Sequence, residues 1–221
     1  MSVLVVGAGG IGGPVARILV DAGVRGITVA DPDIVEVENL HRQILFDDRD
    51  LGRRKADVVA ERLGVEAVAV RVDGASEALV RGRACVIDGT DSFADKYLLN
   101  DLCLSLGVPL VHAAAAQFRG QVLLVRPGGP CLRCLLPEPP DAATDECRVA
   151  GIFGPAAGVV AALAAAEALR AIAGDMAASA LLLADLSSGR LERARLLPAE
   201  GCRCAARGGG RGPDRGPLRS G

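Results

Sequence analysis

The segment Val3-Leu-Val-Val-Gly-Ala-Gly-Gly-Ile-Gly12 decides the fold of this chain. A short apolar run meets closely spaced glycines, and an apolar, helix-like stretch then leads to a second apolar run that ends at Asp31. Glycines let the backbone approach a phosphate, the amino end of a helix attracts anions, and a carboxylate about twenty residues further on can bind ribose hydroxyls. The pattern predicts a nucleotide-binding α/β fold, although by itself it suits dehydrogenases, flavin enzymes and ATP-using enzymes alike. The candidate nucleotide contacts in this segment are Gly7, Gly9, Gly10, Gly12 and Asp31.

Length and composition favour one globular domain with a short tail. The chain has 221 residues, of which 50% are hydrophobic, and a formal net charge of -2. Such a chain can bury one substantial core. From Arg203 onward five arginines accompany one acidic residue, Asp214, so the rest of the chain is mildly acidic. No overall basic field predicts a nucleic-acid partner.

The sequence predicts a cytoplasmic protein without a membrane span. Glycines interrupt the first apolar run, so no cleavable signal sequence is expected. The longest apolar stretch, 159–173, is mostly alanine and contains Glu167 and Arg170, which argues against a transmembrane helix. The chain has seven cysteines, and an odd number without an export signal indicates free thiols, a metal site or catalysis rather than disulfides.

Apolar runs alternate with helical patterns along most of the chain. Strands are expected at 3–6, 27–30, 67–70, 84–87 and 109–113, and helices at 11–22, 51–63, 93–106 and 152–173. This alternation predicts a Rossmann-like α/β fold, with a largely parallel sheet and helices on both faces. Further strands at 121–126, 181–184 and 190–196 lack long crossovers. We therefore expect the sheet to become mixed or antiparallel in the C-terminal third.

We expect a single ATP-binding domain over residues 1–204. Segment 127–150 is rich in Pro, Gly, Cys and acidic residues and is too long for an ordinary connection, so it is predicted to be a functional crossover loop. The glycine-rich end of the chain has little to bury, and residues 205–221 are predicted to form a disordered tail.

Cationic and amide side chains follow Asp31. Asn39, Arg42 and Gln43 form one group, and Lys55 lies at the start of the next predicted helix. Such a set has no evident role in hydride transfer, whereas an enzyme that displaces pyrophosphate from ATP needs cations to neutralise the triphosphate. The alternative for Lys55 is an ordinary solvated helix face, but its context favours the phosphate role.

A second polar group follows the fourth predicted strand. Asp88, Asp91 and Ser92 lie at the sheet edge where open α/β folds bind their ligands. A carboxylate there can hold Mg²⁺ between phosphate oxygens, and Asp91 is the better candidate because it lies beyond the strand. Asp91 or Ser92 could also cap the helix that follows.

Taken together, these segments resemble the ThiF-type family, bacterial relatives of ubiquitin-activating enzymes that adenylate the carboxy terminus of small sulfur-carrier proteins. Several segments are weak signals alone, but they occur in the family's order and span residues 3–204. The matching segments are 7–12, 31–33, 39–43, 52–55, 88–91, 131–134 and 147–155.

The resemblance implies a reaction and its participants. The terminal glycine carboxylate of a ubiquitin-like carrier ending in Gly-Gly would attack the α-phosphate of ATP, giving an acyl adenylate and pyrophosphate. No general base is required, because this nucleophile is already ionised at neutral pH. A homodimer is also implied. The implied roles are nucleotide approach at Gly10, ribose binding at Asp31, phosphate contacts at Asn39, Arg42 and Lys55, and Mg²⁺ binding at Asp91, with Gln43 and Ser92 as further nucleotide contacts.

The cysteines divide into three groups. In ThiF-type proteins the residue that matches Cys147 is linked with capture of the activated carrier or with sulfur transfer; the alternative is an ordinary loop thiol. Cys131 and Cys134 have the spacing of half a structural zinc site, and the resemblance implies that Cys202 and Cys204 supply the other half. The family spacing there is Cys-x-x-Cys, so the one-residue spacer makes four-sulfur coordination harder. Three ligands, or no metal, remain open.

A second departure from the family pattern concerns the start of the chain. Family members usually begin with a helix whose arginine reaches the partner subunit's ATP site, whereas this chain opens on its first strand. Another cation could substitute, activity could be weakened, or the reading frame could begin upstream.

The two histidines, His41 and His112, stand alone in the sequence, and His112 is expected to be a polar residue at a strand end. Cys85 and Cys103 are expected in the core. The alternative functions are adenylation of a peptide or tRNA-linked carboxylate, a non-catalytic homologue, and an NAD-dependent oxidoreductase.

Overall fold

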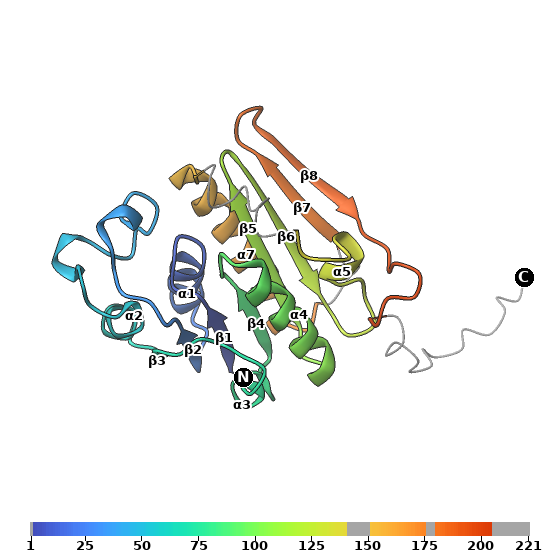
Figure 1. The fold of residues 1–221 in the computed structure, drawn as a ribbon, viewed down its shortest axis with the longest axis horizontal. Helices are drawn as coiled ribbons and strands as arrows, with labels where there is room; N and C mark the ends of the chain where they lie inside the picture. Colours follow the sequence, from blue (N-terminus) through green and yellow to red (C-terminus); the bar gives the residue numbers. More distant parts are fainter. Residues whose placement is uncertain (1, 141–150, 176–179, 205–221) are drawn as a thin grey trace, which may run out of the picture.

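The computed structural model describes residues 2–140, 151–175 and 180–204, and one eight-stranded sheet runs through them (Figure 1). The strand order is β3-β2-β1-β4-β5-β6-β7-β8. Neighbouring strands are parallel from β3 to β5 and antiparallel from β5 to β8. The strands are β1 (Val3–Val6), β2 (Ile27–Ala30), β3 (Glu66–Val68), β4 (Cys85–Asp88), β5 (Leu110–Ala116), β6 (Arg119–Val125), β7 (Ala180–Asp185) and β8 (Arg190–Arg195). The predicted fold class, including the antiparallel C-terminal third, is confirmed.

Helices cover both faces of the sheet. Residues of α1, α2 and α7 share one hydrophobic cluster with Val3 and Val5, whereas residues of α3, α4 and α5 share the other with Leu4 and Val6. Successive side chains of a strand point to opposite faces, so β1 contributes to both clusters and is buried throughout. The helices are α1 (Gly12–Asp21), α2 (Lys55–Leu63), α3 (Glu77–Val80), α4 (Phe93–Leu106), α5 (Leu132–Leu135) and α7 (Gly154–Ile172), with short 3-10 turns η1 (Val37–Asn39) and η2 (Asp48–Asp50).

Helix α7 is long and apolar enough to cross a membrane by length and composition alone. In this fold its alanine-rich face packs on α1, β5 and β6 instead. Ala161, Ala164 and Ala168 are fully buried there, because small side chains allow the helix to approach the sheet closely. These alanines are therefore buried within the chain.

Several element boundaries differ from those predicted. The helix expected from residue 51 begins only at Lys55, because residues 48–50 form η2, which is closed by its own capping box. Strand β5 continues to Ala116, since it pairs along its whole length with β6. Short α3, α5 and the 3-10 turns were not predicted, because elements of three or four residues show no periodicity. Residues 141–150 of the predicted crossover loop and 205–221 of the predicted tail lie outside the described residues.

Candidate functional site

Three parallel strands end at the same level and build one edge of the site. Val6, the last residue of β1, pairs with Ala30 of β2 and with Asp88 of β4. The loops that follow these strands must therefore meet, since the carboxyl ends of parallel strands share one edge of a sheet. The glycine loop and Asp31 are brought together in this way.

The glycine loop is too tight for larger side chains. Gly7 has a φ of +88°, and a Cβ atom there would lie 2.8 Å from the carbonyl oxygen of Gly89. A Cβ atom on Gly12 would lie 1.8 Å from the carbonyl oxygen of Gly7. No side chain caps the first turn of α1. The loop therefore presents bare backbone and an uncapped helix end, a combination that suits an anionic ligand.

Asp31 is a buried and fixed carboxylate. It accepts hydrogen bonds from the backbone N–H of Ala8 at 2.6 Å and of Asp33 at 2.8 Å, and it is 3% exposed. Burial raises the pKa of Asp31, outweighing these hydrogen bonds and the nearby Lys55 ammonium, which lower it. The carboxylate is thus tied directly to the glycine loop, as a ribose-binding acceptor should be.

Residues 39–43 lie against the glycine loop. The Arg42 guanidinium donates to Asn39 Oδ1 at 2.6 Å, so Asn39 orients Arg42. The Arg42 carbonyl oxygen lies 3.0 Å from where a Cβ atom of Gly10 would be, and the Gln43 amide nitrogen lies 3.5 Å from the corresponding position at Gly9. Gln43 is buried, and among the described residues its Oε1 is the buried side-chain atom that lacks a hydrogen-bond partner. An unpaired buried acceptor is costly, which is consistent with a ligand group binding there.

Lys55 is buried at the start of α2 and paired with Asp33. Its Nζ donates to Asp33 Oδ2 at 3.1 Å, and its backbone N–H donates to the Asp33 carbonyl oxygen at 2.9 Å. The Lys55 side chain is 6% exposed, whereas that of Asp33 is 63% exposed. Because Asp33 also donates its backbone N–H to Asp31, the lysine is fixed relative to the ribose candidate. This role of Asp33 was not predicted from the sequence; its position two residues after Asp31 was the available signal.

Asp88 and Asp91 lie in different environments. Asp88 is fully buried and accepts hydrogen bonds from Thr90 Oγ1 at 2.7 Å and from His112 Nδ1 at 2.8 Å, with Lys96 Nζ at 3.4 Å. Burial alone would raise the pKa of Asp88, but Lys96 and these hydrogen bonds outweigh it and hold that pKa at about 2. Asp91 is exposed beyond the strand. The structure thus separates a structural aspartate from one that is free to bind a cation.

Ser92 serves as the helix cap of α4. Its Oγ accepts a hydrogen bond from the backbone N–H of Asp95 at 3.2 Å. This satisfies one otherwise unpaired N–H of the first turn, so the capping alternative holds for Ser92 rather than for Asp91.

A groove of about 670 Å³ begins at Asp91 and crosses the α4 side of the antiparallel strands. Its walls are mostly apolar, with exposed Asp91 and buried Lys96 and His112 at one side and charged side chains of β6 to β8 at the other: Arg119, Asp185, Arg190 and Glu192. The groove is lined by Asp91, Lys96, His112, Ala114, Leu135 and Leu183, among others. A groove of this size that reaches the polar edge can hold an extended ligand.

His112 corrects one expectation. It lies inside β5 rather than at a strand end, and it is 1% exposed. Burial lowers the pKa of His112, although the Asp88 carboxylate raises it in part. The prediction was wrong because β5 extends three residues further than the sequence indicated. The role of Lys96 was also missed, since a single lysine within a helical pattern is usually solvated.

Four cysteines gather where α5 meets the segment that follows β8. The sulfur atoms of Cys131, Cys134, Cys202 and Cys204 all lie within 4.8 Å of one another. The separations are 4.0 Å for Cys131–Cys134, 3.6 Å for Cys131–Cys202 and 3.3 Å for Cys134–Cys204. Four sulfurs at about 2.3 Å around a tetrahedral ion would be roughly 3.8 Å apart. The one-residue spacer therefore does not prevent the second pair from reaching a common centre.

The remaining cysteines fall into two cases. Cys85 and Cys103 are buried in β4 and α4, as expected, and burial raises the pKa of Cys85 to about 12. Both thiols are therefore protonated and shielded at neutral pH. Cys147 lies outside the described residues.

Comparison with known proteins agrees with this geometry. The ThiF family model matches residues 1–206. The chain is 45% identical over 189 residues to the sulfur carrier protein adenylyltransferase of Thermus thermophilus, covering 78% of this chain and 69% of the relative. It is 41% identical over 177 residues to the SAMP-activating enzyme E1 of Haloferax volcanii, covering 76% and 66%.

Longer relatives and solved structures extend the match. The mouse adenylyltransferase and sulfurtransferase MOCS3 is 39% identical over 208 residues, which cover 88% of this chain and 45% of MOCS3. The chain thus spans between about half and two thirds of the length of these relatives. The crystal structure of Escherichia coli MccB with ATP has a TM-score of 0.78 at 22% identity, covering 93% of this chain and 67% of MccB, which shows a shared fold. The glycine loop, the ordered motifs and these matches together show that the chain belongs to the ThiF family.

Proposed function

We propose that this protein is an adenylyltransferase that uses ATP to activate the C-terminal glycine carboxylate of a small ubiquitin-like sulfur-carrier protein. The single observation that carries the proposal is the position of Asp91, which lies beyond β4 at the polar edge and also lines the groove. The names of relatives at 41% and 45% identity, a SAMP-activating enzyme E1 and a sulfur carrier protein adenylyltransferase, support this activity.

The polar edge would bind ATP. Gly7, Gly9, Gly10 and Gly12 let the backbone approach the phosphates, Asp31 would accept hydrogen bonds from the ribose, and Asn39, Arg42, Gln43 and Lys55 would surround the triphosphate. Asn39 acts chiefly by orienting the Arg42 guanidinium. Lys55 would exchange its Asp33 partner for a phosphate oxygen, at little desolvation cost because it is already buried.

The acyl adenylate forms by displacement at the α-phosphorus. A carboxylate oxygen of the carrier forms a bond to this phosphorus, and the bond to the oxygen that bridges the α- and β-phosphates breaks. Both of its electrons leave with pyrophosphate. Arg42 and Lys55 would stabilise the charge that develops on the leaving group, which is the main demand of phosphoryl chemistry.

Asp91 has the donor chemistry for Mg²⁺. It is an exposed carboxylate, it lies just beyond β4, and among the described residues it is not engaged as a helix cap. Hard oxygen ligands of this kind suit Mg²⁺, and the ion held by Asp91 would supply positive charge to neutralise the triphosphate. The buried Asp88 is unsuited, since Lys96, His112 and Thr90 already occupy it.

The groove would receive the carrier's tail. The small side chains of Ala114 and Ala116 would leave room for a Gly-Gly terminus that approaches Asp91. The thiol cluster fits a structural Zn²⁺ site by ligand number and sulfur separation. It would tie α5 to the segment that follows β8, and α5 forms one wall of the groove.

We further propose a cytoplasmic homodimer, as in the family resemblance, in which Cys147 captures the activated carrier or takes part in sulfur transfer. Exposed apolar side chains near η1 and η2, including Val37 at 71% and Ile44 at 75% exposure, are available for self-association. Light scattering of the purified protein measures the mass and tests the dimer directly.

Pyrophosphate exchange tests the proposed function. The protein is incubated with ATP, Mg²⁺, labelled pyrophosphate and a carrier ending in Gly-Gly. Label should enter ATP only with that carrier, and a carrier extended by one alanine should be inactive because its carboxylate no longer reaches the α-phosphate. Binding of NAD without ATP binding would favour the oxidoreductase alternative. ATP binding without exchange with any carrier would favour a peptide substrate or a non-catalytic homologue.

A further inference from the structure

The two cationic candidates of the site are joined by one irregular segment, which we call the strap (residues 40–54). The strap carries Arg42 and Gln43 near its beginning and ends immediately before Lys55. Apart from the single turn of η2 it has no regular secondary structure. The separation of Arg42 and Lys55 therefore depends on what holds the strap in place.

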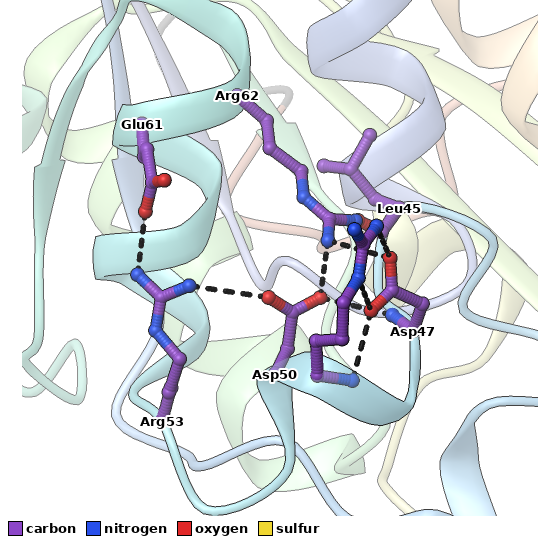
Figure 2. Close-up of polar contacts among 7 residues, drawn as sticks. Leu45, Asp47, Asp50, Arg53, Glu61 and Arg62 are labelled. Carbon is purple, nitrogen blue, oxygen red and sulfur yellow. Dashed lines mark hydrogen bonds and ion pairs between the residues drawn. The ribbon is translucent and has the colours of Figure 1, made fainter.

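Arg62 ties the strap to helix α2 (Figure 2). Its guanidinium donates to the carbonyl oxygen of Leu45, to Asp47 Oδ2 at 3.0 Å and to Asp50 Oδ2 at 2.5 Å. Three acceptors from three positions of the strap thus converge on one side chain of the helix that Lys55 opens. A planar guanidinium can hold such a set, whereas a lysine ammonium is a single charged point.

Asp50 is the buried counterpart of Arg62. Its side chain is 2% exposed, and it accepts hydrogen bonds from the Asp47 backbone N–H at 2.9 Å and from Arg53 at 3.2 Å. Arg53 reaches on to Glu61 of α2 at 2.5 Å. A buried carboxylate held by two arginines is rigid, because losing either partner leaves an incompletely compensated charge.

The other side of the strap is held by the phosphate loop and α1. The Leu45 side chain lies 3.5 Å from where a Cβ atom of Gly13 would be, and the Arg42 carbonyl lies close to Gly10. Phe46 is buried in the same cluster as α1 and α2. The strap is thus clamped between the helix that begins at the glycine loop and the helix that begins at Lys55.

We propose that Arg62 and Asp50 are positioning residues for the triphosphate. They fix the strap on α2 and thereby set the distance at which Arg42 and Lys55 face a common ligand. The inference rests on the proposed function, since it takes these two cations as contacts of the β- and γ-phosphates. Neither Arg62 nor Asp50 touches the ligand itself.

The test compares Arg62→Met with Arg49→Met. Arg49 is a matched control, because it lies in the strap and pairs with the same Asp47, at 2.7 Å. Its side chain, however, is 87% exposed, and among the described residues its side-chain hydrogen bonds stay within the strap. Calorimetry measures the affinity for ATP and for AMP, which lacks the β- and γ-phosphates. For Arg62→Met we expect ATP binding to weaken about tenfold and AMP binding less than about threefold, because a small displacement of phosphate contacts is costly. Arg49→Met should change both by less than about twofold.

Further variants keep the test decisive. Arg62→Lys should fall between wild type and Arg62→Met for ATP. If Arg62→Met does not fold, Asp50→Asn, which keeps the shape of the side chain, should show the same preferential loss of ATP over AMP. Equal losses for ATP and AMP, or an effect equal to that of Arg49→Met, would overturn the inference. Wild-type protein that binds ATP but shows no carrier-dependent exchange would instead contradict the proposed function, and the ATP-to-AMP ratio would still test the strap.

Discussion

The parallel and antiparallel halves of the sheet present different surfaces. In the parallel half, short strands end together and the polar candidates lie in the loops beyond them, from the glycine loop to Lys55. In the antiparallel half, longer strands expose a broad face with a mostly apolar groove, and the four thiols lie beyond it. Strand ends gather charged loops around a compact ligand, whereas a broad sheet face can hold an extended one. Two substrates of different shape can thus meet at the border, next to Asp91.

The largest expected effect is on the parallel half. Lys55→Met and Asp91→Ala should each lower the rate of pyrophosphate exchange by at least about a hundredfold, since each removes charge stabilisation at the triphosphate. Asp91→Ala should leave the melting temperature nearly unchanged because Asp91 is exposed. Asp21→Ala, which removes an exposed acid at the last residue of α1, is the control and should retain full activity. Full activity of Asp91→Ala would contradict the role in adenylation that we propose for the polar edge.

The second effect concerns stability in the antiparallel half. Cys131→Ser should lower the melting temperature by roughly 10 °C if the thiol cluster holds a structural metal. The affinity for ATP should stay within about twofold of wild type, because the cluster lies away from the polar edge. Metal analysis should find about one zinc per chain in wild type and little in the variant. An unchanged melting temperature would exclude a structural metal.

Filling the groove should weaken binding of the carrier without changing the affinity for ATP. Ala114→Leu adds bulk to the wall of the groove and should raise the KM for the carrier about tenfold, because the tail loses space. Calorimetry should show unchanged affinity for ATP. A change in ATP affinity with an unchanged carrier KM would contradict the assignment of ATP binding to the parallel half and of carrier binding to the antiparallel half.

Two buried groups at the border between the halves, His112 and Asp88, should make the free energy of unfolding depend on pH. His112 is buried with a lowered pKa, so below about pH 6.5 the unfolded chain takes up a proton that the folded chain does not. Stability should therefore fall as the pH drops from about 6.5 to 5, by at most about 1.4 kcal/mol per pH unit. Asp88, whose pKa is lowered to about 2, adds a second loss between about pH 4 and 2.

Urea unfolding at several pH values measures this dependence. His112→Asn should flatten the slope between pH 6.5 and 5, whereas His41→Asn should retain it, since His41 is exposed. Equal slopes in the two variants would show that the buried histidine is not the source.

The smallest expected effect concerns Cys147. Cys147→Ala should leave pyrophosphate exchange at the wild-type rate, because adenylation precedes the capture step in which we place this thiol. Transfer of the activated carrier or of sulfur should be lost instead. A parallel loss of exchange would contradict this late role.

The sequence could predict much of the polar edge because its signals are local. Glycines at fixed offsets, an aspartate after β2 and a serine before α4 can each be recognised within a stretch of a few residues. It could not predict that Asp33 holds Lys55, or that Arg62 holds Leu45 and Asp50, because these partners are set by how the strap folds over α2.

By itself the sequence determined the α/β class, the order of the main strands and helices, and the membership in the ThiF family. These features follow from periodicity and ordered motifs, which depend only on the order of residues in the chain. Tertiary structure alone decided that Asp88 is enclosed while Asp91 is free, that His112 is buried beneath the groove, and that a one-residue spacer still lets four sulfur atoms meet. The physical reason is that burial and sulfur separation depend on strand pairing across the sheet, which brings together residues that are distant in the sequence.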